Sequence, residues 1–428
     1  MLLIGQNRRF LFLQGPHGPF FGALGKSLRA TGAEVTRVGF NRSDQLFWRG
    51  GGYIPYRGMP EDWPSYLANL VKERGITDIV LYGASRPIHQ AALDLDVTTH
   101  VFEEGYLRPY WITYERGGAN ASSDLMDISL PDMEGALAQD HPKLTEAPDR
   151  WGDMNQHMFW GAAYHAVLMA GNRGYPGFRP HRTPGVNREF LLHFAKLVST
   201  PIRAALRALA SQRIKRGGFP YHLVLLQLAH DANFRDFGPF EDQAGFLSDV
   251  MRGFASGAPS HHHLVLKAHP LEDGREPLRP LIKRLSTTYG LEERVHFVSG
   301  GKLAQLLDGA RSAVTVNSTS AEQALWRGLP LKVYGKAVFH RPEFASEQPI
   351  SDFFRTPQSM DHSAYLTYRG FLLATSQIPG GFYAYRNRRK VLRQLPDLML
   401  AQNGPYVQIL CPESKHAATK QHLRVVLR

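Results

Sequence analysis

Two carboxylates stand side by side at positions 103 and 104 of this 428-residue sequence, directly after an apolar stretch that predicts a strand. Adjacent carboxylates can raise one another's pKa, which favours a proton acceptor near neutral pH. Because neighbouring side chains of a strand diverge, only one of Glu103 and Glu104 can enter a cleft. Arg108 and Tyr106 could hold the other one. Taken alone, such a doublet is more typical of a solvated acidic turn.

A histidine follows a second predicted strand, at 263–267, in the run KAHP at 267–270. The proline ends the strand and fixes the turn, so His269 is presented at the carboxyl edge of the sheet. A histidine there can donate a hydrogen bond or a positive charge to a phosphate leaving group. The histidine triplet at 261–263 has no partners at a fixed spacing, and it indicates a solvated strand start rather than a metal site.

Four small polar residues lie between a predicted strand at 313–316 and a predicted helix at 320–327. They are Asn317, Ser318, Thr319 and Ser320. Hydroxyl groups and free backbone N–H groups at a helix N-terminus can form an anion site. An ordinary helix cap needs only one of these residues, so an anion site and a simple cap both remain open.

A turn rich in glycine and proline, GPHGP at 15–19, follows the first predicted strand at 9–14. Glycines at a strand's carboxyl end let the backbone approach a ligand, and the next helix N-terminus favours anions. The spacing is neither GxGxxG nor a P-loop, so a tight turn without a ligand is the alternative. The candidate residues of this acceptor or cleft loop are Gln14, Gly15, Pro16 and Gly18, together with Arg108.

Strands and helices alternate in two parts of the chain, and this alternation must position the candidate residues. Predicted strands lie at 9–14, 35–40, 78–82 and 98–102, and then at 221–228, 263–267, 295–298, 313–316 and 330–333. Strands separated by helices of about a dozen residues indicate parallel sheets with right-handed crossovers. We therefore expect an α/β fold with two Rossmann-like, doubly wound domains that face a cleft, joined by a helical connector. This is the GT-B layout.

The charge balance favours an anionic partner. There are 50 Lys and Arg against 38 Asp and Glu, a formal charge of +12, which suits a nucleotide, a nucleic acid or an anionic membrane surface. The basic residues are dispersed and no nucleic-acid motif is recognised, so we predict no nucleic-acid partner. One cysteine, Cys411, excludes an intramolecular disulfide framework and a Cys-based zinc site.

No apolar run approaches the roughly 20 residues of a membrane-spanning helix. Arg8 and Arg9 interrupt the stretch that a signal peptide would need to be apolar. We therefore expect a cytoplasmic protein, with attachment to a membrane surface left open. The basic stretches at 202–216 and 385–393 are candidates for that contact, although a solvated helix face explains each equally well.

Six segments of the sequence resemble the bacterial capsule β-Kdo transferases of the KpsS type, a likeness that covers about residues 9–385. The segments are RFLFLQGPHGPFF (9–21), VGFNRSDQLFW (38–48), VFEEGYLRPYWITYERGGANASS (101–123), LVLKAHP (264–270), RPLIKRLSTTYGL (279–291) and VTVNSTSAEQAL (314–325). Two departures accompany the likeness. Ala268 stands where the family often has a second histidine, and residues 386–428 extend past the usual end.

The resemblance implies transfer of Kdo from CMP-Kdo to lyso-phosphatidylglycerol or a similar lipid, which starts the poly-β-Kdo linker of a capsular polysaccharide. By likeness to sialyltransferases that use CMP-sugars, it implies that Glu103 or Glu104 is the base. The residues that it implies for the donor are Lys267, His269, Pro270, Asn317, Ser318, Thr319 and Ser320. It also implies a peripheral place at the inner face of the inner membrane, near other capsule assembly proteins.

We expect neither a cofactor nor a metal ion. CMP-Kdo carries one phosphate and a carboxylate, so a cationic pocket is needed but Mg²⁺ to bridge a diphosphate is not. A single displacement would expel CMP with inversion. Two alternatives remain: a transferase for another CMP-sugar, such as a sialic acid, and a non-catalytic capsule export or assembly protein.

The expected domain boundaries follow the same alternation. Residues 1–125 form an N-terminal acceptor domain, 126–218 a helical connector, 219–345 a C-terminal nucleotide-sugar domain, and 346–428 a helical segment and tail.

Overall fold

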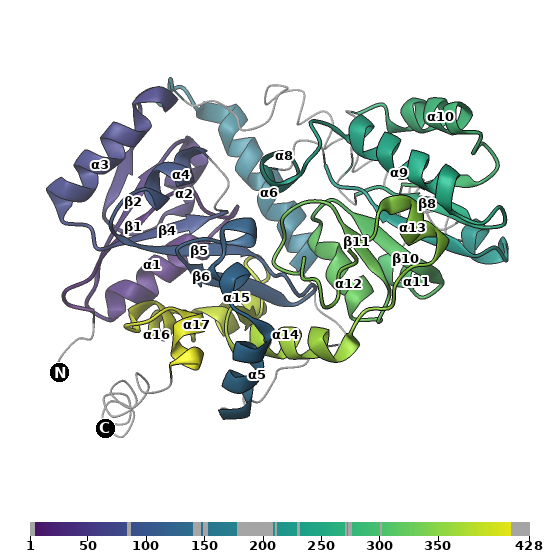
Figure 1. The fold of residues 1–428 in the computed structure, drawn as a ribbon. Helices are drawn as coiled ribbons and strands as arrows, with labels where there is room; N and C mark the ends of the chain where they lie inside the picture. Colours follow the sequence, from purple (N-terminus) through teal and green to yellow (C-terminus); the bar gives the residue numbers. More distant parts are fainter. Residues whose placement is uncertain are drawn as a thin grey trace. The chain divides into compact units, whose positions relative to one another are not determined.

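A computed structural model describes residues 5–83, 87–139, 147–148, 153–177, 209, 212–228, 232–269, 272, 276–299 and 302–411. The chain divides into two compact units. Unit 1 comprises Met1–Asn187 and Tyr368–Arg428, and unit 2 comprises Arg188–Thr367 (Figure 1). Residues 346–367 thus belong to unit 2, whereas the rest of the expected C-terminal segment belongs to unit 1.

Unit 1 is built on a sheet with seven described strands, in the order β12-β6-β5-β4-β1-β2-β3. The strands are β1 (Arg9–Phe12), β2 (Glu34–Gly39), β3 (Tyr53–Pro55), β4 (Asp78–Tyr82), β5 (Thr98–Glu104), β6 (Trp111–Arg116) and β12 (Gln377–Pro379). The first five are parallel to one another. β6 runs antiparallel to β5, and β12 runs antiparallel to β6. Strand β12 therefore brings the C-terminal part of the chain into the sheet of the N-terminal part.

Both faces of the unit 1 sheet are buried, which explains why its strands are almost continuously apolar. Phe10 and Phe12 face a core with the helices α1 and α15, whereas Leu11 and Leu13 face a core with α3 and α4. The helices of this unit are α1 (Phe20–Ala30), α2 (Arg42–Phe47), α3 (Trp63–Arg74), α4 (Pro87–Leu93), α5 (Leu130–Gln139), α6 (Asp153–Gly171), α15 (Tyr385–Leu392), α16 (Leu395–Leu400) and α17 (Pro405–Leu410). The helix α14 (His362–Ala374) runs from unit 2 into unit 1.

Unit 2 is built on a sheet with five described strands, all parallel, in the order β11-β10-β7-β8-β9. The strands are β7 (Tyr221–Leu225), β8 (His263–Lys267), β9 (Val295–Val298), β10 (Ala310–Thr315) and β11 (Leu331–Val333). The helices are α8 (Ala232–Phe237), α9 (Gln243–Gly257), α10 (Leu278–Tyr289), α11 (Leu303–Leu307), α12 (Glu322–Leu325) and α13 (Ile350–Arg355). Apolar side chains of α9, α10 and α13 pack on the sheet to form the core.

The predicted α/β class with two Rossmann-like units is confirmed. Within each unit the five parallel strands take the order third, second, first, fourth, fifth along the chain. The order therefore reverses between β1 and β4 in unit 1, and between β7 and β10 in unit 2. Open α/β sheets bind their ligands outside the carboxyl ends of the strands at such a reversal.

Some elements differ from their predicted bounds. β5 continues through Glu104 because β6, which was not predicted, extends the ladder beside it. The helix predicted at 320–327 is a short 3-10 turn, Thr319–Ala321, followed by the single turn of α12. The described part of the expected connector contains α5 and α6 of unit 1, whereas the basic stretch at 202–216 lies largely outside the described residues. Within the described ranges, no helix is both long and apolar enough to cross a membrane.

Candidate active site

The acidic doublet forms the end of β5 rather than a turn that follows it. Glu103 lies opposite Thr113 and Glu104 lies opposite Ile112 in the antiparallel ladder with β6. Consecutive residues of a paired strand point to opposite faces of the sheet. The two carboxylates therefore lie at the carboxyl end of the sheet but have different surroundings.

Glu104 is held by two tyrosines. Its Oε1 accepts hydrogen bonds from the hydroxyl of Tyr82 at 3.1 Å and from the hydroxyl of Tyr383 at 3.4 Å. Burial, with the nearby charge of Glu104, raises the pKa of Tyr82 well above its usual value, so this phenol stays protonated and able to donate. The ring of His157, on α6, stacks on the ring of Tyr383 with centroids 4.3 Å apart and planes 2° from parallel.

Glu103 lies on the other face, beside the end of β4. A Cβ atom added at Gly83 would stand 3.4 Å from Glu103 Oε2, and Gly83 itself has a φ of +77°. The backbone N–H of Glu104 donates to Glu103 Oε1 at 3.3 Å. Glu103 thus lies beside the backbone of Gly83, the residue that follows β4.

The two residues expected to support the doublet make their contacts elsewhere. Arg108 Nε donates to the carbonyl of Gly105 at 3.1 Å, and the buried Tyr106 hydroxyl accepts from the N–H of Asn120 at 2.6 Å. They shape the loop between β5 and β6. Tyr383, which does hold Glu104, was missed because it lies 279 residues further along the chain.

The glycine- and proline-rich turn after β1 is packed against its own unit. Any side chain at Gly15 would overlap the ring of Phe21, and a Cβ at Gly18 would lie 2.9 Å from Trp160 of α6, at a φ of +95°. The Gln14 amide donates to the Tyr164 hydroxyl at 3.3 Å. These contacts explain both glycines without a ligand, and Pro16 is buried beside them. The role of this loop in binding an acceptor stays a prediction.

Helix α6 is anchored by a buried polar network that starts in the segment FNRSD. Asn41 caps α2 by accepting from the N–H of Asp44, and its amide donates to the Tyr164 hydroxyl at 2.6 Å. Asp44 accepts from Arg37 at 2.9 Å and from the N–H of Phe40 at 3.1 Å. The network fixes α6 against the sheet, and α6 in turn carries His157 to Tyr383.

In unit 2, the candidate histidine lies two residues beyond β8. His269 is half-buried, and its carbonyl accepts from the N–H of Glu272 at 3.0 Å. Lys267 is the last residue of β8, is 6% exposed, and donates to the carbonyl of Ala268 at 3.3 Å. Pro270 lies outside the described residues.

Asn317 is part of a bridge across the reversal point of the unit 2 sheet. Gln227, just after β7, donates to Asn317 Oδ1 at 2.8 Å and accepts from the Asn317 N–H at 3.0 Å. The Asn317 amide also donates to the carbonyl of Asn233 at 2.7 Å. The side chain of Asn317 thus braces the loops, and Gln227 is a residue that sequence reasoning missed. A polar residue inside the apolar run LVLLQLA was the available signal.

Three residues with hydroxyl groups, Ser318, Thr319 and Ser320, follow Asn317 directly. Ser318 caps the 3-10 turn by accepting from the N–H of Ser320 at 3.3 Å, and the two hydroxyls lie 2.7 Å apart. Ser318, Thr319 and Ser320 are each half-buried. Because the helix that follows is so short, its dipole adds little, and anion binding would depend on these hydroxyls and the backbone N–H groups.

The histidines at the amino ends of the unit 2 strands form hydrogen-bonded pairs. His222 is hydrogen-bonded through Nδ1 to the Ser312 hydroxyl at 2.8 Å and through Nε2 to His262 Nδ1 at 3.1 Å. His263 Nδ1 is hydrogen-bonded to His296 Nε2 at 2.9 Å. His262 is only 4% exposed, so the expectation of a solvated strand start is wrong for this residue. Among the described residues, no group of three or more His, Cys, Asp or Glu could hold a metal ion.

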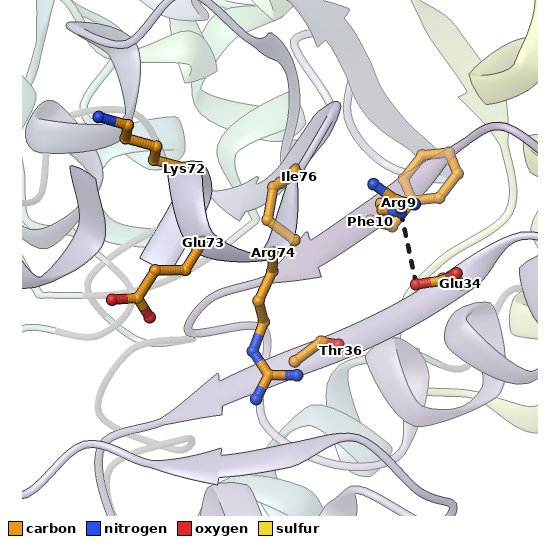
Figure 2. A pocket seen from close by; sticks show the side chains of 9 residues that line it. Arg9, Phe10, Glu34, Thr36, Lys72, Glu73, Arg74 and Ile76 are labelled. Carbon is orange, nitrogen blue, oxygen red and sulfur yellow. Dashed lines mark ion pairs between the residues drawn. The ribbon is translucent and has the colours of Figure 1, made fainter. Parts of the chain in front are cut away.

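A polar pocket of about 510 Å³ lies at the opposite end of the unit 1 sheet, where β1 and β2 begin. Figure 2 shows Arg9 and Glu34, which form an ion pair at 3.5 Å, with Lys72 and Arg74 of α3 in the same lining. Because this pocket is at the amino ends of the strands, it does not include the acidic doublet.

Comparison with known proteins gives matches over most of the chain. The family described as "Capsule polysaccharide biosynthesis protein" matches residues 77–383. The capsule polysaccharide export protein KpsS of Escherichia coli is 31% identical over 390 residues, which cover 88% of this chain and 97% of that protein. The capsule polysaccharide modification protein LipB of Neisseria meningitidis serogroup B is 28% identical over 398 residues, 89% of this chain and 93% of that protein. Among solved structures, the β-Kdo 2,7 transferase KpsC of Thermosulfurimonas dismutans aligns with a TM-score of 0.45 and 13% identity, over 92% of this chain and 100% of that chain.

Proposed function

Since the chain belongs to the family of capsule polysaccharide biosynthesis proteins, we propose that it is an inverting β-Kdo transferase. It moves Kdo from CMP-Kdo to a phosphatidylglycerol-type lipid and so starts the poly-β-Kdo linker of a capsular polysaccharide. The donor and the acceptor come from the resemblance to the KpsS-type transferases, which includes the acidic, His-Pro and Asn-Ser-Thr-Ser segments.

The observation that carries the proposal is the position of the polar groups on the two Rossmann sheets. In unit 1 the carboxylates of Glu103 and Glu104 end β5, and in unit 2 His269 follows β8 while Ser318 and Thr319 follow β10. Each set lies at the carboxyl ends of its sheet, the edge at which such sheets bind ligands. A base from unit 1 and phosphate ligands from unit 2 are the two sets of groups that the reaction requires.

The chemistry is a single displacement. A carboxylate of the doublet takes the proton of the acceptor hydroxyl while the hydroxyl oxygen attacks the anomeric carbon of Kdo. The bond from that carbon to the phosphate oxygen breaks, and CMP leaves with the electron pair. His269 and the hydroxyls of Ser318 and Thr319 stabilise the charge that grows on the phosphate, with Lys267 adding positive charge nearby. Asn317 and Ser320 position these groups.

The decisive experiment is mass spectrometry of the products from purified protein, CMP-Kdo and a fluorescent phosphatidylglycerol analogue. We expect the lipid to gain the mass of one or more Kdo units as CMP is released. The same reaction with CMP-sialic acid tests the alternative donor. A lipid unchanged by either donor would contradict the proposal.

A non-catalytic role in capsule export is the second candidate, favoured by the name of the Escherichia coli relative, an export protein. Release of CMP that depends on the lipid separates the two, because an assembly protein would release none.

We also propose that the protein works at the inner face of the inner membrane, alongside other capsule assembly proteins. Its charge of +12 suits anionic lipids, and α15 exposes Arg386 and Arg389 on one side. Co-sedimentation with vesicles containing phosphatidylglycerol tests this placement. Binding that is equal for neutral vesicles, or absent for both, would contradict it.

A further inference from the structure

Helix α6 exposes apolar side chains on one face and packs the opposite face against unit 1. On the packed face, Trp160 contacts the ring of Phe47, and Tyr164 and Leu168 are buried. The exposed apolar residues recur every three or four positions, so they form one stripe along the helix. This α6 stripe consists of Met158, Phe159, Ala162, Ala166, Met169 and Ala170.

The α6 stripe has no charged residue to keep it in water. After Asp153, the sequence of α6 contains no Asp, Glu, Lys or Arg. The side chains of Phe159, Met158 and Met169 are 62%, 56% and 37% exposed, and within the described ranges no other helix exposes more than one large apolar side chain. A contiguous exposed apolar surface indicates contact with a protein partner or with a membrane.

The basic helix α15 begins beside the first turns of α6, because both helices contact Tyr383. The ring of Tyr383 stacks on His157 of α6 with centroids 4.3 Å apart, and its carbonyl accepts from Arg388 of α15 at 3.1 Å. The sequence of α15, YRNRRKVL, has four basic residues and no acidic one. Its first residue, Tyr385, is 63% exposed, and the guanidinium groups of Arg388 and Arg389 lie 5.8 Å and 5.7 Å from the centre of its ring. Apolar side chains beside cationic and aromatic ones are typical of surfaces that bind anionic phospholipid.

We propose that the α6 stripe docks the protein on an anionic phospholipid membrane, with the stripe among the acyl chains and the basic residues of α15 at the phosphates. The proposal rests on the proposed function, since it names the surface that brings a lipid acceptor to unit 1. His157, at the start of α6, stacks on Tyr383, whose hydroxyl bonds Glu104, so the stripe begins close to the acidic doublet. A protein could also cover an apolar face, but the cations of α15 complement the phosphates of a lipid surface.

Phe159→Glu and Met169→Glu test the α6 stripe, because each places a charge where contact with acyl chains is proposed. Both side chains are exposed, so both variants should remain folded. In co-sedimentation with vesicles of phosphatidylglycerol and phosphatidylcholine, we expect each variant to bind at least about 10-fold more weakly than wild type. Wild-type affinity in both variants would overturn the proposal.

Leu366→Glu is the matched control. Leu366 is an apolar side chain of α14 that is 44% exposed, and its replacement changes the net charge by the same amount. The control should bind vesicles as tightly as wild type. A loss in the control equal to that in the α6 variants would mean that net charge alone determines binding, which would also overturn the proposal.

A fluorescent label reports directly on insertion. Cys411 is the only cysteine of the chain, so Cys411→Ser allows one label to be placed at a chosen position. The emission of an environment-sensitive dye at Phe159→Cys should shift to the blue when vesicles are added, whereas the same dye at Leu366→Cys should not respond. Light scattering of Phe159→Glu tests the alternative occupant. A changed oligomeric state with unchanged vesicle binding would assign the stripe to a second copy of the chain and overturn the proposal.

Turnover separates this proposal from the proposed function. With CMP-Kdo as donor, the ratio of turnover on a vesicle-bound acceptor to turnover on a water-soluble short-chain acceptor should fall by about 10-fold in Phe159→Glu and stay the same in Leu366→Glu. An unchanged ratio in Phe159→Glu would overturn the docking role. Absence of turnover by wild type on both acceptors would contradict the proposed function, and vesicle binding and the dye would then decide the docking role by themselves.

Discussion

His269 lies two residues beyond the end of β8, and its carbonyl accepts a hydrogen bond from the N–H of Glu272. The side chain is half-buried, so it is accessible to a ligand while its backbone is fixed. A group of this kind lowers the barrier when it is already oriented toward the position where charge develops.

His269→Ala should therefore lower the rate of CMP release by about 10²-fold or more, because it removes a donor that the proposed mechanism places at the leaving phosphate. His269→Asn, which keeps a donor, should lose less. Steady-state kinetics with CMP-Kdo gives the rate, and thermal unfolding should show that both variants remain folded. Wild-type turnover in the alanine variant would contradict the assignment.

At the scale of the element, a buried ion pair between Arg37 and Asp44 stabilises α2 and the loop before it. Arg37 and Asp44 have side chains that are 3% and 2% exposed, and Asp44 also bonds Asn41 and the backbone of Phe40. Removal of one partner of a buried pair leaves the other charge uncompensated.

Asp44→Ala should destabilise unit 1 by about 3–5 kcal/mol, which urea unfolding can measure. Arg355 and Asp352 on α13 form the matched control, since both side chains are about half exposed. Asp352→Ala should change the free energy of unfolding by no more than about 1 kcal/mol. Equal effects of the two substitutions would show that the Asp44 network is dispensable.

The buried histidines at the amino ends of β7 and β8 should lower the free energy of unfolding of unit 2 in acid. Burial lowers the pKa of His222 to about 3 and that of His262 to about 4, against 6.5 in the unfolded chain. The free energy of unfolding therefore falls as the pH drops from 6.5 toward 4. Over that range the two histidines bind protons in the unfolded chain but stay neutral in the folded protein.

His222→Gln should therefore flatten the loss of stability between pH 7 and pH 5 relative to wild type. Denaturant unfolding of both proteins over that range measures the difference. Parallel pH profiles would mean that the buried histidines are not responsible.

Local pattern and long-range contact explain what the sequence could and could not predict. The alternation of strands and helices is local, so the doubly wound units and the position of Glu103 and Glu104 at a strand end were predictable. The contact of Tyr383 with Glu104 and that of Gln227 with Asn317 depend on strand order, which no local pattern encodes. β5 was predicted too short because two glutamates are typical of a turn, yet pairing with β6 continues through both.

At the scale of the whole molecule, the chemistry of the proposed sugar-nucleotide donor determines whether the reaction requires a metal ion. The proposed donor, CMP-Kdo, has a single phosphate, so in the proposed mechanism histidine, lysine and hydroxyl groups stabilise the leaving group without a metal ion. Activity with preformed CMP-Kdo should persist in excess EDTA and should not rise when Mg²⁺ is added. A loss in EDTA that Mg²⁺ reverses would contradict the proposed mechanism.

Strand β12 and the helices after it complete unit 1 only after the whole of unit 2 has been made. During synthesis, the N-terminal part of unit 1 therefore leaves the ribosome before β12 is made. Until then, β6 lacks the strand that pairs with it at the edge of the sheet. Unit 2 is continuous in sequence, so it can fold as soon as it emerges. A stop codon that removes β12 and everything after it should leave unit 2 able to fold, while unit 1 lacks part of its core. Pulse proteolysis of such truncated chains would show this difference between the units.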